Sequence, residues 1–195
     1  MENHVINKIE ELEKFKDEYG YKIDGNLILN CAVDIGGRFF VTGSIEAVGS
    51  IEAVGSIEAV GSIKAGGYIE AGGYIEAGGS IEAVGSIEAV GSIKAGGYIK
   101  AGGYIEAGGS YGITTGLSIN CKGSLKFGLN CFAGIGTWRE MKDIDKTITC
   151  GKLEGGKIAY GILKETGLES DKVKITCEGR AVEISRESAK ALNLI

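Results

Sequence analysis

Isoleucine recurs every six residues through the middle of the chain, over eleven consecutive units. The isoleucines are Ile45, Ile51, Ile57, Ile63, Ile69, Ile75, Ile81, Ile87, Ile93, Ile99 and Ile105. Each unit has the sequence Ile-(Glu/Lys)-Ala-(Val/Gly)-Gly-(Ser/Tyr). Residues 50–79 and 80–109 are the same 30 residues except that Glu70 becomes Lys100. Because this duplication leaves the period intact, each unit must be nearly interchangeable with its neighbours.

The six-residue frame extends beyond these units, and we predict twenty units over residues 21–140. Before the isoleucines, first positions are Tyr21, Leu27, Val33 and Phe39, and third positions are Ile23, Leu29, Ile35 and Val41. After them, the same frame gives Tyr111, Leu117, Gly123, Leu129 and Ile135 as first positions, and Ile113, Ile119, Leu125, Cys131 and Thr137 as third positions. Gly123 breaks the apolar pattern, and Leu125 follows it two residues later.

Apolar first and third positions around a polar second position have the period of a β-strand, and glycine at the fifth position marks a corner. Short strands with a corner every six residues predict an all-β fold, a β-solenoid in which each coil stacks on the next. A triangular coil of three units would give nearly seven coils, roughly 30 Å long at about 4.8 Å per coil. A flat coil of two units is the alternative.

The chain has 195 residues with 34 Gly and no Pro. The missing proline fits a solenoid, because nearly every strand N–H is needed in the hydrogen-bond ladder. The composition excludes collagen, which needs Gly at every third position and abundant Pro, and no run of about 20 apolar residues predicts a membrane span. The net charge of −5 and the absence of a basic tract argue against direct binding of nucleic acid. An acidic start and an odd number of cysteines predict an intracellular, cytoplasmic protein with reduced thiols.

The units resemble two known families. The aliphatic first position with a small residue four places later, as in Ile45 and Gly49, resembles the hexapeptide left-handed β-helices. The Gly-Ser-Ile-Glu-Ala phrase is more similar to the bactofilin-like, polymer-forming β-helices. Valine at the fourth position, as at Val48, departs from the left-handed pattern, which favours a positive φ there, so a right-handed coil is favoured. The whole chain, including residues 132–139 and 148–153, also resembles uncharacterised β-solenoid proteins of gut Firmicutes and their phages.

The two ends differ from the repeats. Val5, Ile9, Leu12, Phe15 and Tyr19 have helical spacing, so we predict an amphipathic helix within residues 1–20 that caps one end of the solenoid; a helix that binds a partner is the alternative. Residues 141–195 predict a small α+β module with strands over 146–153, 157–164, 172–177 and 181–184 and a short helix from Ser185 to about Leu192. A module of this size buries a marginal core, so we expect it to dock on the solenoid or to dimerise.

The second position of each unit points outward, and a three-unit coil would stack these positions in three columns. The first contains Glu46, Lys64, Glu82 and Lys100, and the second contains Glu58, Glu76 and Lys94. The third, which we call the acidic column, contains Glu52, Glu70, Glu88 and Glu106. Like charges stacked in this way repel one another, so the acidic column is either a recognition stripe resembling a phosphate backbone or a solvated face that discourages aggregation.

Tyrosine replaces serine at the sixth position of four units, as Tyr68, Tyr74, Tyr98 and Tyr104. Exposed tyrosines are common at binding surfaces. They are therefore candidate binding residues, although they could instead shield the hydrogen bonds of the ladder.

The chain offers little for catalysis. Its one histidine, His4, lies near the start, and no phosphate-binding loop is present. Cys31 and Cys121 fall at the fifth position and Cys131 at the inward third position, which favours small buried side chains over ligands or nucleophiles. We expect no enzyme activity, no catalytic residue, no metal and no cofactor.

Two functional hypotheses follow. The first is a nonenzymatic binding protein that uses the acidic column and the tyrosines against a protein partner in a host macromolecular complex. The resemblance to phage proteins suggests an inhibitor of host defence or nucleic-acid handling, similar in mode to anti-CRISPR proteins. The second is a bactofilin-like scaffold that assembles into homo-oligomers through its ends or its C-terminal module. Neither hypothesis involves a membrane.

Overall fold

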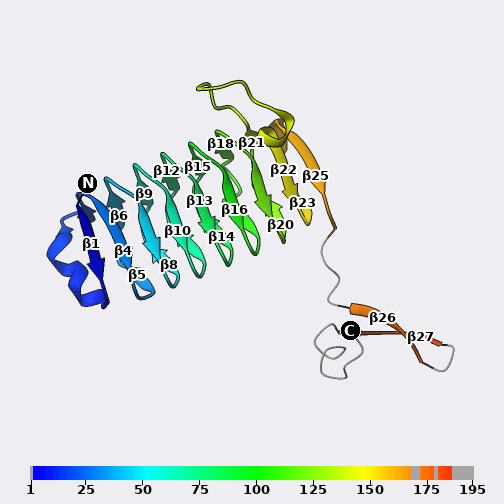
Figure 1. Ribbon diagram of the computed structural model, residues 1–195, viewed down its shortest axis with the longest axis horizontal. Coiled ribbons are helices and arrows are strands. Elements are labelled where there is room, and N and C mark those ends of the chain that lie inside the picture. Colours follow the sequence, from blue (N-terminus) through cyan, green and yellow to red (C-terminus); the bar gives the residue numbers. More distant parts are fainter. Residues whose placement is uncertain (1, 168–171, 178–179, 186–195) are drawn as a thin grey trace.

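The computed structural model describes residues 2–167, 172–177 and 180–185, and residues 3–165 form a parallel β-solenoid (Figure 1). Ile63 pairs with Ile81 and Ala65 with Ala83, so equivalent residues of successive coils lie 18 positions apart. Each coil therefore has three units and three sides, as the triangular alternative predicts. The flat coil of two units is wrong.

Three sheets run along the solenoid, and apart from the pairing of β2 with β3, each strand pairs only with strands three places before or after it. Sheet A contains β1 (Asn3–Ile6), β4 (Asn26–Leu29), β7 (Ile45–Ala47), β10 (Ile63–Ala65), β13 (Ile81–Ala83), β16 (Ile99–Ala101), β19 (Ile119–Cys121), β22 (Thr147–Cys150) and β25 (Ile162–Glu165). Sheet C contains β5 (Val33–Ile35), β8 (Ile51–Ala53), β11 (Ile69–Ala71), β14 (Ile87–Ala89), β17 (Ile105–Ala107), β20 (Ser124–Lys126) and β23 (Lys152–Glu154). Sheet B contains β2 (Lys16–Asp17), β3 (Gly20–Ile23), β6 (Arg38–Val41), β9 (Ile57–Ala59), β12 (Ile75–Ala77), β15 (Ile93–Ala95), β18 (Ile113–Thr115), β21 (Asn130–Ala133) and β24 (Lys157–Tyr160).

The core is one continuous stack of inward side chains. Isoleucines at first positions, such as Ile87, are 0–1% exposed, and alanines at third positions, such as Ala89, are at most 6% exposed. The two residue types share each strand from β7 to β17, so the interior alternates large and small side chains over residues 45–107. This packing explains why the units are nearly interchangeable: each contributes the same volume to the same layer.

The coil is right-handed. In Figure 1 the chain advances to the right while the nearer strands run downward and the farther strands run upward. Among the described glycines, those with positive φ are Gly20, Gly25 and others from Gly134 onward, so the corners of the central repeats do not use that region. The valines at fourth positions fit such corners.

The predicted frame is wrong after Ala107, because two extra residues enter the next corner. Ile93 pairs with Ile113, which lies 20 positions later, and Tyr111 N–H donates to Gly108 O (2.8 Å) in the turn between them. The true first positions are therefore Ile113, Ile119, Leu125 and Cys131, each 0% exposed. The residues that the unbroken frame places first, Tyr111, Leu117, Gly123, Leu129 and Ile135, are only half-buried or exposed.

The amphipathic helix predicted within residues 1–20 is reduced to one short 3₁₀ helix between two strands. Residues 3–6 form β1, which pairs with β4 and so begins sheet A, and Lys16–Asp17 form β2, which pairs antiparallel with β3. Between them lies η1 (Ile9–Phe15), a 3₁₀ helix whose Leu12 is 1% exposed in the core. Backbone pairing with the first coil overrides the helical spacing of the apolar residues.

The solenoid does not end at residue 140. A segment containing the 3₁₀ helix η2 (Asp143–Lys146) interrupts the repeat, and β22, β23, β24 and β25 then pair in parallel with β19, β20, β21 and β22. The predicted strands over 146–164 therefore extend the solenoid rather than a separate module. β26 (Lys172–Cys177) and β27 (Arg180–Ser185) form an antiparallel hairpin. Ser185 is the last residue of β27, and the rest of the predicted helix, from residue 186 to about Leu192, lies outside the described residues.

Candidate functional site

The acidic column forms on the outer face of sheet C. Glu52 pairs with Glu70, Glu70 with Glu88, and Glu88 with Glu106, one coil apart in each case. The column is longer than the sequence prediction, because Asp34 of β5 pairs with Glu52. It is also partly neutralised, because Lys126 of β20 follows Glu106 and its Nζ lies 2.6 Å from Glu106 Oε1.

Ion pairs along the other two sheets neutralise their columns. On sheet A, Lys64 pairs with Glu46 and Lys100 with Glu82; on sheet B, Arg38 pairs with Glu58 and Lys94 with Glu76. Within the described part of the chain, four successive acids of sheet C make no ion pair. These four, which we call the open acidic run, are Asp34, Glu52, Glu70 and Glu88. Sheet C therefore carries most of the unbalanced negative charge of the repeats.

Glu70 lies inside the open acidic run, between Glu52 and Glu88. Partial burial, followed by the charges of these two neighbours, raises the pKa of the Glu70 carboxyl above its ordinary value. A raised pKa means that the folded protein binds a proton at Glu70 more readily than the unfolded chain does. This carboxylate therefore opposes folding at neutral pH, and its contribution improves as the pH falls through the raised pKa.

Glu70→Gln is expected to raise the free energy of unfolding at pH 7 by about 0.2 to 1 kcal/mol, since it removes repulsion between stacked like charges. The gain should shrink at pH 4, where Glu70 is increasingly protonated. Urea denaturation at both pH values measures the difference. Glu46→Gln is the control, because it removes the partner of Lys64 and should give no gain. An equal gain in the free energy of unfolding at both pH values would contradict charge repulsion at Glu70 as its cause.

The four tyrosines at sixth positions reach back to the glutamate one coil earlier. Tyr68 Oη donates to Glu52 (3.0 Å), Tyr74 to Glu58 (2.7 Å), Tyr98 to Glu82 (3.1 Å) and Tyr104 to Glu88 (2.7 Å). The bond from Tyr104 to Glu88 is the main reason that the pKa of Tyr104 rises to about 12. Each tyrosine residue remains between 37% and 42% exposed. Each tyrosine thus orients a carboxylate while it presents part of its ring to solvent.

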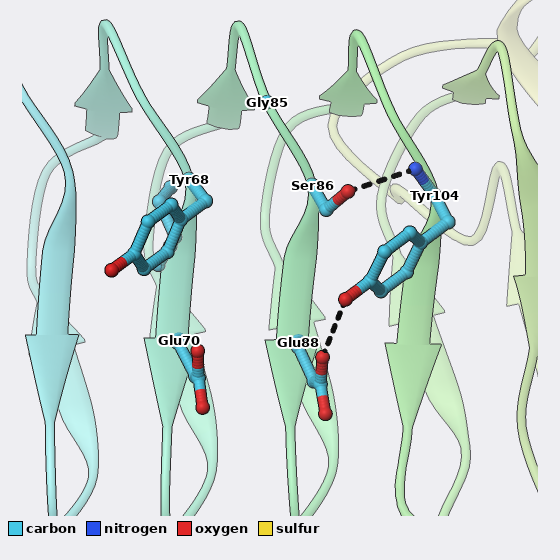
Figure 2. A pocket seen from close by; sticks show the side chains of 7 residues that line it. Tyr68, Glu70, Gly85, Ser86, Glu88 and Tyr104 are labelled. Carbon is cyan, nitrogen blue, oxygen red and sulfur yellow. Dashed lines mark hydrogen bonds between the residues drawn. The ribbon is translucent and has the colours of Figure 1, made fainter.

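Serine side chains at sixth positions accept hydrogen bonds from the backbone N–H of the tyrosines one coil later. Ser86 Oγ accepts a hydrogen bond from Tyr104 N (3.2 Å), and Ser50 Oγ accepts one from Tyr68 N (3.2 Å). Along this corner the sixth positions therefore alternate as Ser50, Tyr68, Ser86 and Tyr104. Figure 2 shows the result, in which a gap without a ring lies between two tyrosine rings.

That gap is a cavity of about 360 Å³, which we call the tyrosine cavity. Its lining residues are Tyr68, Ile69, Glu70, Gly85, Ser86, Glu88 and Tyr104. Four of them are residues that the sequence identifies as candidate binding residues. The structure brings Glu70, Glu88, Tyr68 and Tyr104 together in one place, whereas Tyr74 and Tyr98 lie on other corners of the coil.

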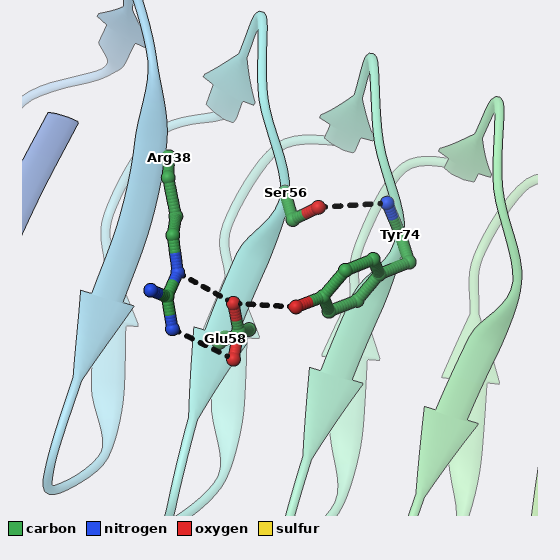
Figure 3. A network of polar contacts seen from close by, with 4 residues as sticks. All are labelled: Arg38, Ser56, Glu58 and Tyr74. Atoms are coloured by element: carbon green, nitrogen blue, oxygen red, sulfur yellow. Dashed lines mark hydrogen bonds and ion pairs between the residues drawn. The ribbon is translucent and has the colours of Figure 1, made fainter. Parts of the chain in front are cut away.

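A different corner carries a complete version of the same group of residues. Arg38 approaches Glu58 with two hydrogen bonds, from Nε to Oε1 (2.7 Å) and from Nη2 to Oε2 (3.1 Å). Tyr74 Oη donates to the same carboxylate, and Tyr74 N donates to Ser56 Oγ (3.1 Å). Figure 3 shows Glu58 held between the guanidinium and the tyrosine hydroxyl. The sequence prediction missed Arg38, although it precedes Phe39 at a sixth position where other units have Ser or Tyr.

The thiols and the histidine lie in structural positions. Cys121 and Cys131 occupy inward positions at 2% and 0% exposure, and burial is the main reason that their pKa values rise to about 12. Cys31 is half-buried, and partial burial raises its pKa as well. His4 Nε2 lies 2.9 Å from the carbonyl oxygen of Asp24, and its ring contacts Phe15 edge-on. The buried thiols stay protonated at neutral pH and are poor nucleophiles.

Within residues 2–167 and the hairpin strands, no three His, Cys, Asp or Glu side chains converge in a way that could hold a metal ion. No helix in this same part of the chain is long and apolar enough to cross a membrane.

The fold defines the class of protein, a parallel β-solenoid built from six-residue units. Comparison with known proteins finds no matching family model, no similar curated protein and no similar solved structure. The resemblances to bactofilin-like and phage proteins therefore gain no support beyond the solenoid itself. The function has to be inferred from the surface of this chain.

Proposed function

We propose that this protein is a nonenzymatic binding protein that uses sheet C to engage a basic surface of a protein partner. The observation that carries the proposal is the open acidic run: Asp34, Glu52, Glu70 and Glu88 stack at successive coils, and their ion-pair partners are absent from the described chain. The other columns neutralise themselves with lysine or arginine. Retaining repulsive charge on one face has a stability cost, which a cationic partner would offset.

The spacing of the carboxylates suggests which surfaces would fit. Coils stack at about 4.8 Å, whereas phosphates along one strand of DNA follow each other at about 3.4 Å of helix axis. A line of negative charges at this spacing resembles a phosphate backbone with a lower charge density. It would attract the lysines and arginines of a partner protein as a nucleic acid does. We therefore propose that the partner is a nucleic-acid-handling complex and that this protein inhibits it by occupying its basic surface. A phage-encoded inhibitor of a host defence complex fits this role.

A catalytic role has less support. The buried thiols of Cys121 and Cys131 have raised pKa values, and His4 is engaged with a backbone carbonyl. The hydroxyls of Tyr68 and Tyr104 donate to carboxylates, which raises the pKa of both hydroxyls, so they stay protonated at neutral pH and little of the nucleophilic phenolate form is present. These observations favour binding over chemistry.

The triple variant Glu52→Gln, Glu70→Gln and Glu88→Gln is expected to weaken binding of a (Lys-Arg)₄ peptide by about three- to tenfold, since each lost charge contact is worth a few tenths of a kcal/mol. Fluorescence anisotropy of the labelled peptide measures the dissociation constant. The matched control changes Glu46, Glu76 and Glu82 to Gln, which alters the net charge equally on sheets A and B. Equal weakening in both variants would show that total charge rather than sheet C determines binding.

A pull-down from nuclease-treated bacterial lysate with the same two variants addresses the partner class. The proposal expects nucleic-acid-handling proteins in the wild-type eluate, with the triple sheet C variant losing them and the control retaining them. Recovery of the same proteins with both variants would contradict the role of sheet C.

A self-assembling scaffold is the second candidate, and the two ends of the solenoid bear on it. At the N-terminal end, Leu12 of η1 is buried, which supports a capping role for this segment. In the last coil, Leu153, Ile158 and Leu163 are only partly buried. Phe15 and Tyr21 at the N-terminal end are also partly buried, but η1 packs against β1 and β3 there, so pairing of two copies through the last coil is favoured over an open filament, which needs two uncovered ends. Light scattering of the wild type and the two triple glutamine variants over a range of protein concentrations distinguishes a fixed dimer from assemblies that grow with concentration.

A further inference from the structure

The group formed by Arg38, Glu58 and Tyr74 shows which ligand this surface is able to hold. The guanidinium makes two hydrogen bonds to the carboxylate, and the tyrosine hydroxyl fixes that carboxylate from the other side (Figure 3). Arg38 lies 20 residues before Glu58, and Tyr74 lies 16 residues after it. Because the units repeat, the same offsets locate equivalent groups elsewhere on the solenoid.

Four glutamates receive a tyrosine hydroxyl in this way, and two of them also have a cation. Arg38 contacts Glu58, and Lys100 Nζ lies 3.3 Å from Glu82. The other two, Glu52 and Glu88, have the tyrosine but no ion pair within residues 2–167. Both lie in the open acidic run on sheet C, one on each side of Glu70. The repeat thus contains one complete group with the offsets of Arg38 and Tyr74, one glutamate whose cation, Lys100, comes from the following coil instead, and two glutamates that have the tyrosine but lack a cation.

The tyrosine cavity occupies the missing position at Glu88. The residue 20 positions before Glu88 is Tyr68, which stands where Arg38 stands relative to Glu58. Tyr68 directs its hydroxyl away to Glu52, so its ring forms one wall of the cavity and leaves the face of Glu88 free. Tyr104 forms the opposite wall, and Ser86, which has no ring, keeps the space open between them (Figure 2).

We propose that the tyrosine cavity holds the guanidinium group of an arginine side chain from the protein partner, between Tyr68 and Tyr104 and against the carboxylates of Glu70 and Glu88. This inference rests on the proposed function and names the chemistry of the partner at one point. Arginine fits better than lysine for two reasons. Its planar group stacks on aromatic rings, and its fork of donors matches a carboxylate with two hydrogen bonds, as Arg38 does within this chain.

The test compares Arg₈ and Lys₈ peptides, which carry the same charge, by fluorescence anisotropy on the full chain. We expect the wild type to bind Arg₈ about fivefold more tightly than Lys₈, which corresponds to one cation–π contact. Ser86→Tyr should abolish this preference without a change in charge, because the new ring fills the cavity and its hydroxyl can reach Glu70, 16 residues earlier. Tyrosine already occupies sixth positions on both sides, so this variant is expected to fold.

Ser92→Tyr is the matched control, because Ser92 follows Tyr74 as Ser86 follows Tyr68 but lies on another corner; it should keep the preference for Arg₈. A second variant, Tyr68→Ser, removes one wall with a residue natural to that position and should also lose the preference. If the wild type binds both peptides equally, or if Ser86→Tyr keeps the preference, the inference is wrong. In that case loss of binding in the triple glutamine variant would still support the proposed function, and its absence would overturn both.

Discussion

Ile87→Ala is expected to lower the free energy of unfolding by about 2 to 5 kcal/mol, the range for large-to-small changes at fully buried positions. Ile87 is 0% exposed in β14 and is stacked between Ile69 and Ile105 of the neighbouring coils. The site cannot collapse easily. Ile87 N donates to Tyr104 O (3.0 Å), and Ile69 N donates to Ser86 O (3.0 Å), so ladder bonds hold the backbone on both sides.

Urea denaturation followed by circular dichroism measures this loss. Ile87→Val should cost only about 0.5 to 1.5 kcal/mol, because it removes one methylene group. Val84→Ala is the surface control: Val84 lies three residues away at 71% exposure, and its change should stay within about 0.5 kcal/mol. A cost for Ile87→Ala no larger than that of Val84→Ala would contradict a rigid, filled interior.

The sequence was sufficient to predict the solenoid, the inward isoleucines and alanines, and, for a coil of three units, the stacking of Glu52, Glu70 and Glu88; the strand pairing decides between coils of three and of two units. Strict repetition makes this possible, since each unit sees the same neighbours and local pattern decides global register. The corner after Ala107 was missed because Tyr111 and Leu117 are apolar and conceal the shift of two residues. Gly123 at a supposed inward position, with Leu125 two places later, was the signal of that shift.

The ends were harder to predict because their pairing is not local. The apolar spacing of residues 3–19 fits a helix, yet residues 3–6 gain a ladder of hydrogen bonds with β4. Similarly, η2 interrupts the frame before β22 resumes sheet A, and no periodicity crosses that interruption. At the candidate site, the sequence predicted the acids and tyrosines but not how they combine. Side-chain hydrogen bonds over offsets of 16 and 20 residues set that combination.

Alanine substitutions at the adjacent glycines Gly108 and Gly109 are expected to differ strongly in their effect on the free energy of unfolding. Gly108→Ala is expected to lower the free energy of unfolding by about 1 to 3 kcal/mol, because the added methyl would overlap the carbonyl oxygen of Val90 in the preceding coil. The overlap is not easily relieved, since Gly108 N already donates to Ala89 O (2.9 Å) and holds the two coils at a fixed spacing.

At Gly109 an added methyl meets no atom within 4 Å, so Gly109→Ala should be neutral or raise the free energy of unfolding by about 0.4 to 1 kcal/mol through the lower entropy of the unfolded chain. Neither residue has a positive φ, so backbone strain does not separate them and the difference reports contact between coils. The midpoints of urea denaturation of the two variants, compared at equal dependence of the free energy on urea, measure the difference in their free energies of unfolding. If both alanines had the same effect, the corners would be looser than the stacked ladder implies, and the units could tolerate side chains at positions that now require glycine.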